Sequence, residues 1–506
     1  MLNMIRYISI FLLLIVINTF SQSNYWVYFD DDYNLTTTIT KIQKAGGTYR
    51  YSSSWLNAAT FVLNTTQKNE IEKLPYVKSI TPVRQLKANH VSADVATLNK
   101  QIEQIKGDCL LQRGLDGKGI KVGIIDAGFS NADSSHYFHH LFSKGLVKKY
   151  KDYIDPDSTD FFESKTTGDT HGASVWKFIA GKDTNNHMVL GLAQGATFYL
   201  ARTEIADKEQ KIEEDKWIEA IEWMHKQGVR VVNSSLGYAD KFDNKKENYE
   251  VTEMDGNTAA ISKAAQIATE EKGMLLVISA GNLGHTAWKV VSAPADAKGV
   301  ISVGATHITE WKKATYSSIG PSYNPFLKPN VSSLSSNGTS FSSPVIAGLA
   351  ACLWQRDTSL TNKQLKKIIE QSSHLYPYGN NYLGYGVPNA KKALAIIDKD
   401  IKALMKRPQY KTVKKDKLVI PLAHEGELNI IGFYKLDKHI VKKQVSLSLK
   451  EGQKKLNHQD NKIHITLTKK AKHINLQINN KSEDIIYTSL SINNKDVYEI
   501  KWSKKQ

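Results

Sequence analysis

Four kinds of side chain that together can carry out nucleophilic chemistry stand beside apolar segments of the chain. Asp126 ends the apolar run IKVGIID, and Asn282 comes directly after MLLVISAG. His171 in GDTHG and Ser340 in NGTSFSSP each stand before a segment of small and apolar residues. A serine becomes a strong nucleophile when a histidine takes its proton, and a carboxylate can fix the tautomer of that histidine. An amide side chain can donate to the oxyanion formed by the attack. The four residues therefore predict a serine nucleophile with an imidazole base.

Each of these residues also has an ordinary structural interpretation. Serine is a preferred N-cap, so Ser340 could simply begin a helix. Asp126 and Asn282 could be turn residues, and His171 could be a polar group at a helix start. Because all four fall at predicted strand ends or helix starts, we favour one shared site over four unrelated coincidences.

From about Gly119 onward, apolar strands alternate with amphipathic helices. Such alternation indicates an α/β fold with a mainly parallel sheet and helices on both faces. In open sheets of this kind, ligands lie beyond the carboxyl ends of the strands. A helix that begins near Ser340 would accommodate Pro344 in its first turn. The predicted strands are 120–125, 197–201, 229–233, 274–279 and 299–305.

The first residues have the pattern of a targeting segment. Arg6 precedes the apolar run Ile8 to Ile17, which is too short to span a bilayer and suits a signal peptide at 1–22. A membrane anchor is the alternative. No later segment approaches the roughly 20 apolar residues that a membrane helix needs. We therefore expect a mature chain without a transmembrane segment, secreted or otherwise extracytoplasmic.

The rest of the chain divides into three regions. Residues 23–95 form a predicted small α/β unit in the order β-α-β-α-β, and a polar stretch from Lys87 to Lys106 resembles a linker. The alternating strands and helices occupy 100–400. Beyond them, LVIPL, VSLSLK, IHITLTK and INLQIN alternate apolar and polar residues, which predicts antiparallel strands in a β-rich domain at 410–506.

The net charge of +17 is concentrated in the C-terminal region, where residues 401–506 contain 23 Lys and Arg against 10 Asp and Glu. A basic surface attracts polyanions or acidic cell surfaces, and a solvated face that aids solubility is the alternative interpretation. The apolar fraction of 41% suits a chain with a sizeable core. Cys109 and Cys352 are the only cysteines, which excludes a disulfide framework and a paired-cysteine metal site.

Four motifs resemble those of the subtilisin family of serine endopeptidases: IIDAGF, GDTHGASVWKFIAG, SAGN and NGTSFSSPVIAG. The order Asp, His, Ser along the chain is also the order of that family. The resemblance covers roughly residues 100–400. It implies that Ser340 attacks the peptide carbonyl, His171 transfers the proton and Asp126 orients His171. The Asn282 amide and the Ser340 backbone N–H would bind the oxyanion.

The resemblance also implies how substrates and the N-terminal region would bind. NSSLG resembles the strand that lines the substrate cleft of the family. It implies that Ser235, Leu236 and Gly237, together with Ala280 and Gly281, offer backbone to an extended protein or peptide substrate. Residues 23–95 resemble the inhibitory, chaperone-like propeptide. We expect this zymogen to cut itself between about Leu86 and Lys106.

The chain departs from the family pattern at three positions. Ala127 follows the aspartate where Thr or Ser is common, so a hydroxyl contact to the carboxylate would be lost. Ser174 replaces a second histidine of the His motif, and Trp176 replaces a small residue. The chemistry requires no cofactor. The acidic stretch from Asp152 to Asp169 is a candidate structural calcium site, with a solvated loop as the alternative.

Two other functions compete with the peptidase. A catalytically silent binding protein could keep this fold and work through its basic C-terminal domain, although the intact set of four site residues argues against it. A lipase-like hydrolase is the less supported alternative, because no G-x-S-x-G motif surrounds Ser340.

Overall fold

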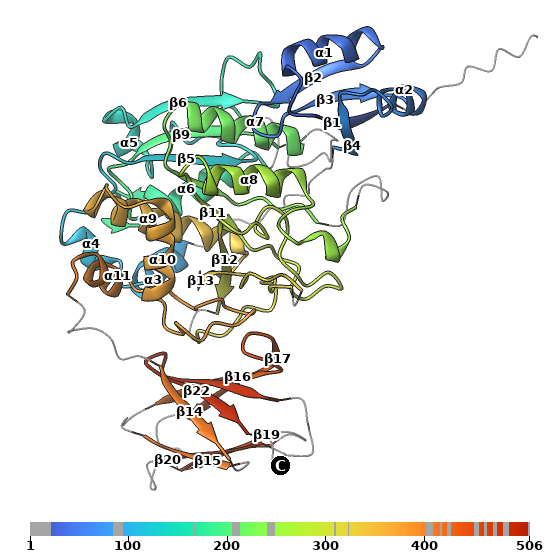
Figure 1. Cartoon of the computed structure of the whole chain (residues 1–506). Helices are drawn as coiled ribbons and strands as arrows, with labels where there is room; N and C mark the ends of the chain where they lie inside the picture. Colours follow the sequence, from blue (N-terminus) through green and yellow to red (C-terminus); the bar gives the residue numbers. More distant parts are fainter. Residues whose placement is uncertain are drawn as a thin grey trace, which may run out of the picture. The chain divides into compact units, whose positions relative to one another are not determined.

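The computed structural model (Figure 1) divides into two compact units, residues 1–83 and 84–506. The predicted signal peptide falls almost entirely outside the described residues. These are 22–83, 95–164, 168–204, 213–239, 248–307, 310–321, 323–400, 408–414, 417–422, 427–449, 455–459, 463–468, 473–478 and 485–503.

The N-terminal unit is a four-stranded antiparallel sheet with two helices. The strands lie in the order β2-β3-β1-β4. The sequence prediction of β-α-β-α-β was wrong by one strand, because TYRYSS forms β2 between the first helix and β3. Asn64 and Gln67 form a capping box that starts the second helix. The elements are β1 (Ser23–Phe29), α1 (Leu35–Lys44), β2 (Thr48–Ser53), β3 (Ala58–Leu63), α2 (Thr65–Ile71) and β4 (Val77–Pro82).

The second unit is built on a parallel sheet of seven strands in the order β13-β12-β11-β10-β5-β9-β6. This arrangement confirms the predicted α/β fold. Strand β6, at one edge, was not among the predicted strands, because VKKYKD is mostly polar. The strands are β5 (Lys121–Asp126), β6 (Val147–Asp152), β9 (Thr197–Arg202), β10 (Val231–Ser234), β11 (Leu275–Ser279), β12 (Ile301–Thr306) and β13 (Val331–Leu334).

Helices cover both faces of this sheet (Figure 1). Val122 and Ile124 of β5 share a core with α6 and α9, whereas a Cβ atom on the intervening Gly123 would clash with Met224 of α7. Trp176, which stands where the family has a small residue, lies in an aromatic cluster in which its ring stacks on Phe138 with centroids 4.4 Å apart. The main helices are α6 (His171–Ala180), α7 (Glu213–Lys226), α8 (Ala260–Glu270), α9 (Ser343–Arg356), α10 (Asn362–Ser372) and α11 (Ala390–Ile397).

Helix α3 (Val95–Gln104) occupies half of the segment that the sequence analysis interpreted as a linker. The buried Gln101 side chain donates to the carbonyl oxygens of Leu334 and Phe341, the latter at 3.0 Å. Gln104 accepts from the Leu334 N–H at 2.7 Å and donates to Thr306 at 2.9 Å. The linker prediction was therefore wrong for these residues, because α3 is fastened to the sheet by buried amide side chains. Short α4 (Asp108–Leu111), α5 (His139–Ser143) and the hairpin β7 (Lys182–Asp183) with β8 (Met188–Val189) complete this part.

The C-terminal region contains two further sheets, in the orders β14-β22-β21-β16-β17 and β15-β20-β19-β18. Ile430 and Leu490 of the first sheet share a core with Ile474 and Leu476 of the second, so the sheets face each other. The predicted strands are present, but β14 pairs parallel with β22. The strands are β14 (Gln409–Val413), β15 (Lys417–Pro421), β16 (Leu428–Lys435), β17 (Val441–Leu449), β18 (Lys455–Gln459), β19 (Ile463–Thr468), β20 (His473–Ile478), β21 (Tyr487–Ile492) and β22 (Asp496–Trp502).

Candidate active site

The carboxyl ends of three neighbouring strands carry residues of the predicted site. β5 ends at Asp126, β10 ends directly before Ser235, and β11 ends directly before Ala280. Because β10 lies between β5 and β11 in the parallel sheet, the three ends share one edge. Helix α6 begins with His171, and a 3₁₀ turn carries Ser340.

A short hydrogen bond joins Asp126 and His171. Nδ1 of His171 lies 2.6 Å from Oδ1 of Asp126, and both side chains are buried. A Cβ atom on Gly172 would lie 2.5 Å from the Gly128 carbonyl oxygen and 2.9 Å from Cβ of Asp126. Glycine at 172 therefore allows helix α6 to start against the loop that follows β5, which brings the imidazole to the carboxylate.

The environment of His171 favours its protonated form. Burial alone lowers the pKa of the imidazole, but the charge of the Asp126 carboxylate and its hydrogen bond raise it. The net result is a pKa above the ordinary value of 6.5. An imidazole in this position can accept a proton and hold it as an imidazolium beside a carboxylate.

Asp126 is held through one of its two oxygens. Oδ1 accepts from His171 and from the N–H of Ala127, the latter at 2.8 Å. Oδ2 is buried and has no hydrogen-bond partner among the described residues. The methyl group of Ala127 therefore leaves unmade the hydroxyl contact that the family resemblance predicts at this position.

Ser340 lies in the 3₁₀ turn Thr339–Phe341, directly before α9. Pro344 is the second residue of that helix, which begins three residues later than predicted. The Ser340 hydroxyl donates to the carbonyl oxygen of Ser235 at 3.3 Å, and the Ser235 hydroxyl donates to the Ser340 carbonyl at 2.9 Å. The ring of Phe341 lies 5.8 Å from the ring of His171. The structure thus places the serine turn beside the imidazole.

Asn282 is oriented by the residue that precedes Ser340. Its Oδ1 accepts from the backbone N–H of Thr339 at 2.8 Å and from the Thr339 hydroxyl at 3.0 Å. A Cβ atom on Gly338, where φ is 122°, would lie 3.2 Å from Nδ2 of Asn282. Because two donors hold the oxygen, the amide group is fixed with its NH₂ end as a donor next to the serine turn.

The five predicted substrate-binding residues do not share one role. Ala280 donates to Val303 and accepts from Ser292, while Gly281 donates to Thr339 and accepts from Ser318. All four of these backbone polar groups already have partners within the protein. The N–H groups of Ala280 and Gly281 are therefore not available to a substrate, whereas each carbonyl oxygen keeps a second lone pair, so their expected contact with an extended substrate stays a prediction. Both residues also lie in the packing that holds Asn282.

The Ser235 side chain is likewise engaged within the protein, since it bonds Ser340 and lies 3.2 Å from the hydroxyl of Ser343. After Leu236 and Gly237, the backbone of Tyr238 pairs with that of Ala293. Leu236 and Gly237 remain predicted contacts for an extended substrate at this edge.

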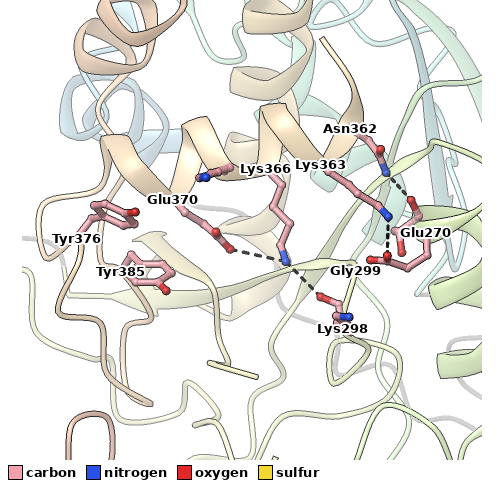
Figure 2. A pocket seen from close by; sticks show the side chains of 11 residues that line it. Glu270, Lys298, Gly299, Asn362, Lys363, Lys366, Glu370, Tyr376 and Tyr385 are labelled. Atoms are coloured by element: carbon pink, nitrogen blue, oxygen red, sulfur yellow. Dashed lines mark hydrogen bonds and ion pairs between the residues drawn. The ribbon is translucent and has the colours of Figure 1, made fainter. Parts of the chain in front are cut away.

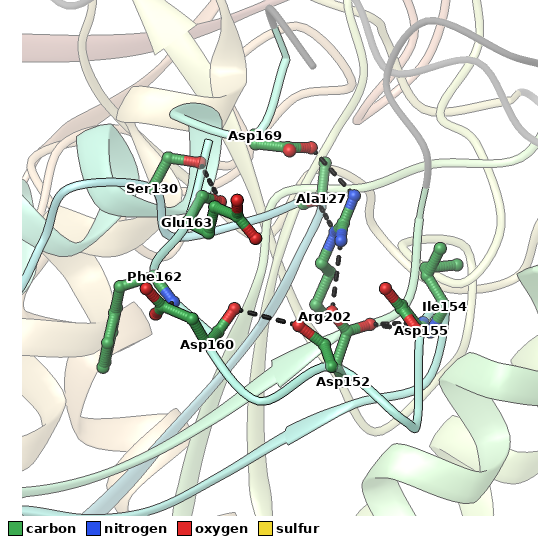
Figure 3. A network of polar contacts seen from close by, with 11 residues as sticks. Ala127, Ser130, Asp152, Ile154, Asp155, Asp160, Phe162, Glu163, Asp169 and Arg202 are labelled. Atoms are coloured by element: carbon green, nitrogen blue, oxygen red, sulfur yellow. Dashed lines mark hydrogen bonds and ion pairs between the residues drawn. The ribbon is translucent and has the colours of Figure 1, made fainter. Parts of the chain in front are cut away.

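Arg202, at the end of β9, is a site residue that sequence analysis missed (Figure 3). Its guanidinium donates to the Ala127 carbonyl at 3.1 Å, to Asp152 at 3.1 Å and to Asp169 at 3.0 Å. It therefore ties the loop after Asp126 to the loop before His171. A charged residue at the end of the apolar run TFYLAR was the available signal, but its partners come from three separate segments.

The same contacts bear on the candidate calcium site. Asp152 and Asp169 already face a positive charge in Arg202, so these two carboxylates do not fit a cation site. Within the described parts of the chain, no group of three or more His, Cys, Asp or Glu side chains is arranged to hold a metal ion.

An open pocket of about 340 Å³ lies against α10, lined by none of the predicted site residues (Figure 2). Its lysines are partly neutralised, because Lys363 pairs with Glu270 at 2.6 Å and Lys366 lies 3.7 Å from Glu370. Because neither Asp126 nor His171 lines it, the pocket is separate from the Asp126–His171 pair.

The parallel sheet with helices on both faces, and a serine turn beside a buried Asp–His pair, define an α/β serine hydrolase. Residues 117–386 match the model of the subtilase family, and residues 29–100 match that of a peptidase S8 propeptide domain of Bacteroidota. Because the first match spans more than half of the chain, the protein belongs to the subtilase family. It is a subtilisin-like serine endopeptidase with a propeptide domain.

Known relatives agree with this assignment. Subtilisin NAT of Bacillus subtilis subsp. natto is 27% identical over 363 residues, which cover 70% of this chain and 84% of that protein. Subtilisin BL of Lederbergia lenta is 28% identical over 301 residues, or 58% of this chain and 97% of that protein.

Among solved structures, the epidermin leader peptide processing serine protease of Staphylococcus aureus superimposes with a TM-score of 0.54. It covers 74% of this chain and 99% of its own, at 18% identity. That likeness concerns the fold. Of the helices in the described residues, none is long and apolar enough to cross a membrane.

Proposed function

We propose that this endopeptidase cleaves protein or peptide substrates through a triad of Ser340, His171 and Asp126. Ser340 Oγ attacks the carbonyl carbon while its proton passes to Nε2 of His171, and the imidazolium then gives that proton to the leaving amine. Water releases the acyl group in the same way. Asp126 stabilises the imidazolium and does not itself take the proton.

The observation that carries this proposal is the 2.6 Å bond between Asp126 and Nδ1 of His171, because it leaves Nε2 as the only ring nitrogen able to act as the base. In the structure the Ser340 hydroxyl donates to the carbonyl oxygen of Ser235. We expect it to exchange this partner for Nε2 when substrate binds, since catalytic hydrogen bonds often tighten only in the complex.

Labelling with a serine-directed fluorophosphonate tests the triad. The wild type should be modified at Ser340, and Ser340→Ala or His171→Ala should lose labelling and turnover by roughly 10⁶. Ser342→Ala is a matched control, because that buried serine bonds Ser333 and should leave labelling unchanged. A Ser340→Ala protein that keeps more than about a tenth of the activity would exclude the triad.

We further propose that Asn282 and the backbone N–H of Ser340 bind the oxyanion. The fixed orientation of the Asn282 amide supports this role. Asn282→Ala should lower kcat by about 10²–10³ with little change in KM, because an oxyanion donor acts mainly in the transition state. An unchanged kcat would mean that Asn282 serves only to hold Thr339.

The propeptide is proposed to inhibit the enzyme until Ser340 cuts it off. An active site takes an extended segment, whereas 95–104 is the helix α3 with buried contacts to the sheet. We therefore narrow the cleavage from the predicted range of Leu86 to Lys106 to its part before Val95. Ser340→Ala protein should accumulate as the uncut precursor, which intact-mass measurement detects. Trimming of that variant at the same bond in a clean host would assign the cut to another protease.

We propose that the protein is exported through its N-terminal segment and that its basic C-terminal domain contacts polyanions. Replacement of the exposed Lys417 and Lys443 by Gln should lower the salt concentration that elutes the protein from heparin. Each lost contact between a lysine and the polyanion reduces the number of counterions released on binding, which weakens the binding and its dependence on salt. Lys118→Gln on the catalytic domain is the matched control. Equal elution of all three proteins would favour the solvated-face interpretation.

A further inference from the structure

The C-terminal domain is connected to both ends of one segment of the catalytic domain, residues 313–320, directly at the first end and through Asn381 at the other. At the first end, the N–H of Lys313 donates to the side chain of Gln444 on β17 at 2.8 Å. At the other end, Gly320 exchanges two hydrogen bonds with Asn381: its N–H donates to the Asn381 carbonyl at 2.8 Å, and Nδ2 of Asn381 donates to the Gly320 carbonyl at 3.1 Å.

Asn381 passes this connection on to the C-terminal domain. Its N–H donates to the carbonyl of His439 at 2.9 Å, and its Oδ1 accepts from the N–H of Val441 at 2.9 Å. Its side chain is buried, with 4% of its surface exposed. Every backbone and side-chain polar group of Asn381 is therefore used in joining the 313–320 segment to β17 and the turn before it.

The middle of the 313–320 segment holds both neighbours of Asn282. The N–H of Ser318 donates to the carbonyl of Gly281 at 3.0 Å, and the Ser318 hydroxyl accepts from the N–H of Leu283 at 3.1 Å. Ser318 is fully buried. The position of the Asn282 backbone thus depends on where Ser318 lies.

The junction between the domains is apolar and closed around these polar contacts. Residues from both sides form one buried cluster against which Trp311 and Tyr382 pack: Leu375 and Leu383 from the catalytic domain, and Ile431, Phe433, Val441 and Val497 from the C-terminal domain. In such surroundings an unpaired amide is costly, which favours a single arrangement of the Asn381 contacts.

We propose that the C-terminal domain positions the oxyanion donor, and that Asn381 and Gln444 are the positioning residues. The contacts run from β17 through Asn381 and Gly320 to Ser318, and from Ser318 to the two residues that flank Asn282. The effect of an oxyanion donor depends on its placement within a fraction of an ångström. The inference rests on the proposed role of Asn282.

A double-mutant cycle tests it. Asn381→Ala should lower kcat about tenfold and leave KM within about twofold, because a displaced donor weakens transition-state binding rather than substrate binding. Gln444→Ala, a milder change at the half-buried end, should lower kcat by a few fold in the same way. In the Asn282→Ala background, each change should cost less than about twofold, since the donor that it positions is already gone.

Controls separate this inference from general damage. Ser448→Ala lies on the same strand as Gln444 and removes a bond to Glu427 within the domain, so it should leave kcat unchanged. Circular dichroism and the fluorophosphonate-labelled fraction report how much of each variant is folded and competent. If Asn381→Ala fails to fold, Gln444→Ala carries the test.

The outcomes are distinct. A wild type that is never labelled at Ser340 would overturn the proposed function itself. A labelled wild type whose Asn381→Ala and Gln444→Ala variants keep full kcat, or lose it equally with and without Asn282, would overturn only the positioning role.

Discussion

Asp126 directs His171 through a single carboxylate oxygen, and the second oxygen of that carboxylate is buried without a partner among the described residues. The loop that follows the aspartate is held by Arg202, whose guanidinium donates to the carbonyl oxygen of Ala127. The charge of Asp126 therefore acts on His171 with little competition from other hydrogen bonds.

The pH dependence of the reaction should report this pair. The base must be neutral, and Asp126 raises the pKa of His171 above 6.5 against the lowering effect of burial. The kcat/KM of the wild type should therefore fall in acid with a midpoint above 6.5. Asp126→Asn removes the raising causes and leaves burial, so the midpoint should move below 6.5, together with a loss of about 10⁴ in kcat. A midpoint that does not move would mean that Asp126 does not set the charge of His171.

Lys328 is a buried ammonium group outside the active site. Nζ donates to the carbonyl oxygens of Ala297 at 2.5 Å and Val300 at 3.3 Å, and to Asn330 at 3.3 Å. Burial lowers the pKa of Lys328 well below 10.5, and Lys366 adds to the effect. The three oxygen partners match the three N–H donors of an ammonium group, whereas removal from water disfavours its charge and is the main cause of the lowered pKa.

This lysine makes stability depend on pH. Between the lowered pKa of the native state and the ordinary value of 10.5, the unfolded chain binds more protons than the native chain, so stability rises with pH. We expect the free energy of unfolding of the parent protein minus that of Lys328→Met to increase from neutral pH toward 10.5. Urea unfolding in a Ser340→Ala background avoids self-digestion. A difference that stays flat with pH would contradict the lowered pKa.

At the scale of elements, α3 is the clearest case of a helix held by polar side chains. Gln101 and Gln104 make the buried hydrogen bonds. Val95, Leu98, Ile102 and Ile105 also recur at helical spacings of three and four residues, a local signal that the linker interpretation overlooked.

Gln101→Leu should test how firmly α3 is fastened. The substitution keeps the size of the side chain and leaves the buried carbonyls of Leu334 and Phe341 without this donor, which should cost about 1–3 kcal/mol of unfolding free energy. Gln112→Leu, at an exposed position after α4, is the matched control and should change little. Urea unfolding of both proteins gives the comparison, and equal stabilities would mean that solvent already reaches these carbonyls.

The sequence predicted most strands of the parallel sheet and placed Asp126, His171, Asn282 and Ser340 at its edge, because apolar runs and short motifs are local signals. It could not predict that the backbone of Ala280 and Gly281 is already paired, since the partners Val303, Thr339 and Ser318 are far away in the chain. Arg202 and Asn381 were missed for the same reason. Their significance lies in which segments they join.

At the scale of the whole molecule, the C-terminal domain is packed against the catalytic domain through an apolar junction. The sequence predicted a β-rich domain at 410–506 that follows the catalytic domain as a region of its own. The buried cluster and the contacts of Asn381 argue against that independence.

Truncation after Asp400 should therefore impair the enzyme. Removal of the domain would expose Leu375 and Leu383 and leave Asn381 without two of its partners. We expect the truncated protein to unfold at a lower temperature and to lose kcat by at least about tenfold, as in the positioning inference. Thermal unfolding and single-turnover kinetics of purified protein measure both effects. A soluble truncated enzyme with full kcat would show that the domain is only an appendage.

The fastening of α3 also sets a time at which the enzyme can become active. Gln101 meets Leu334 and Phe341 across sequence separations of 233 and 240 residues. Contacts between such distant segments close large loops and form slowly, after local helices and hairpins. During synthesis, the hydrogen bonds of Gln101 to Leu334 and Phe341 cannot form until the ribosome has released more than two hundred further residues. The turn that carries Ser340 is thus completed late, when most of the catalytic domain is already outside the ribosome and able to fold around it.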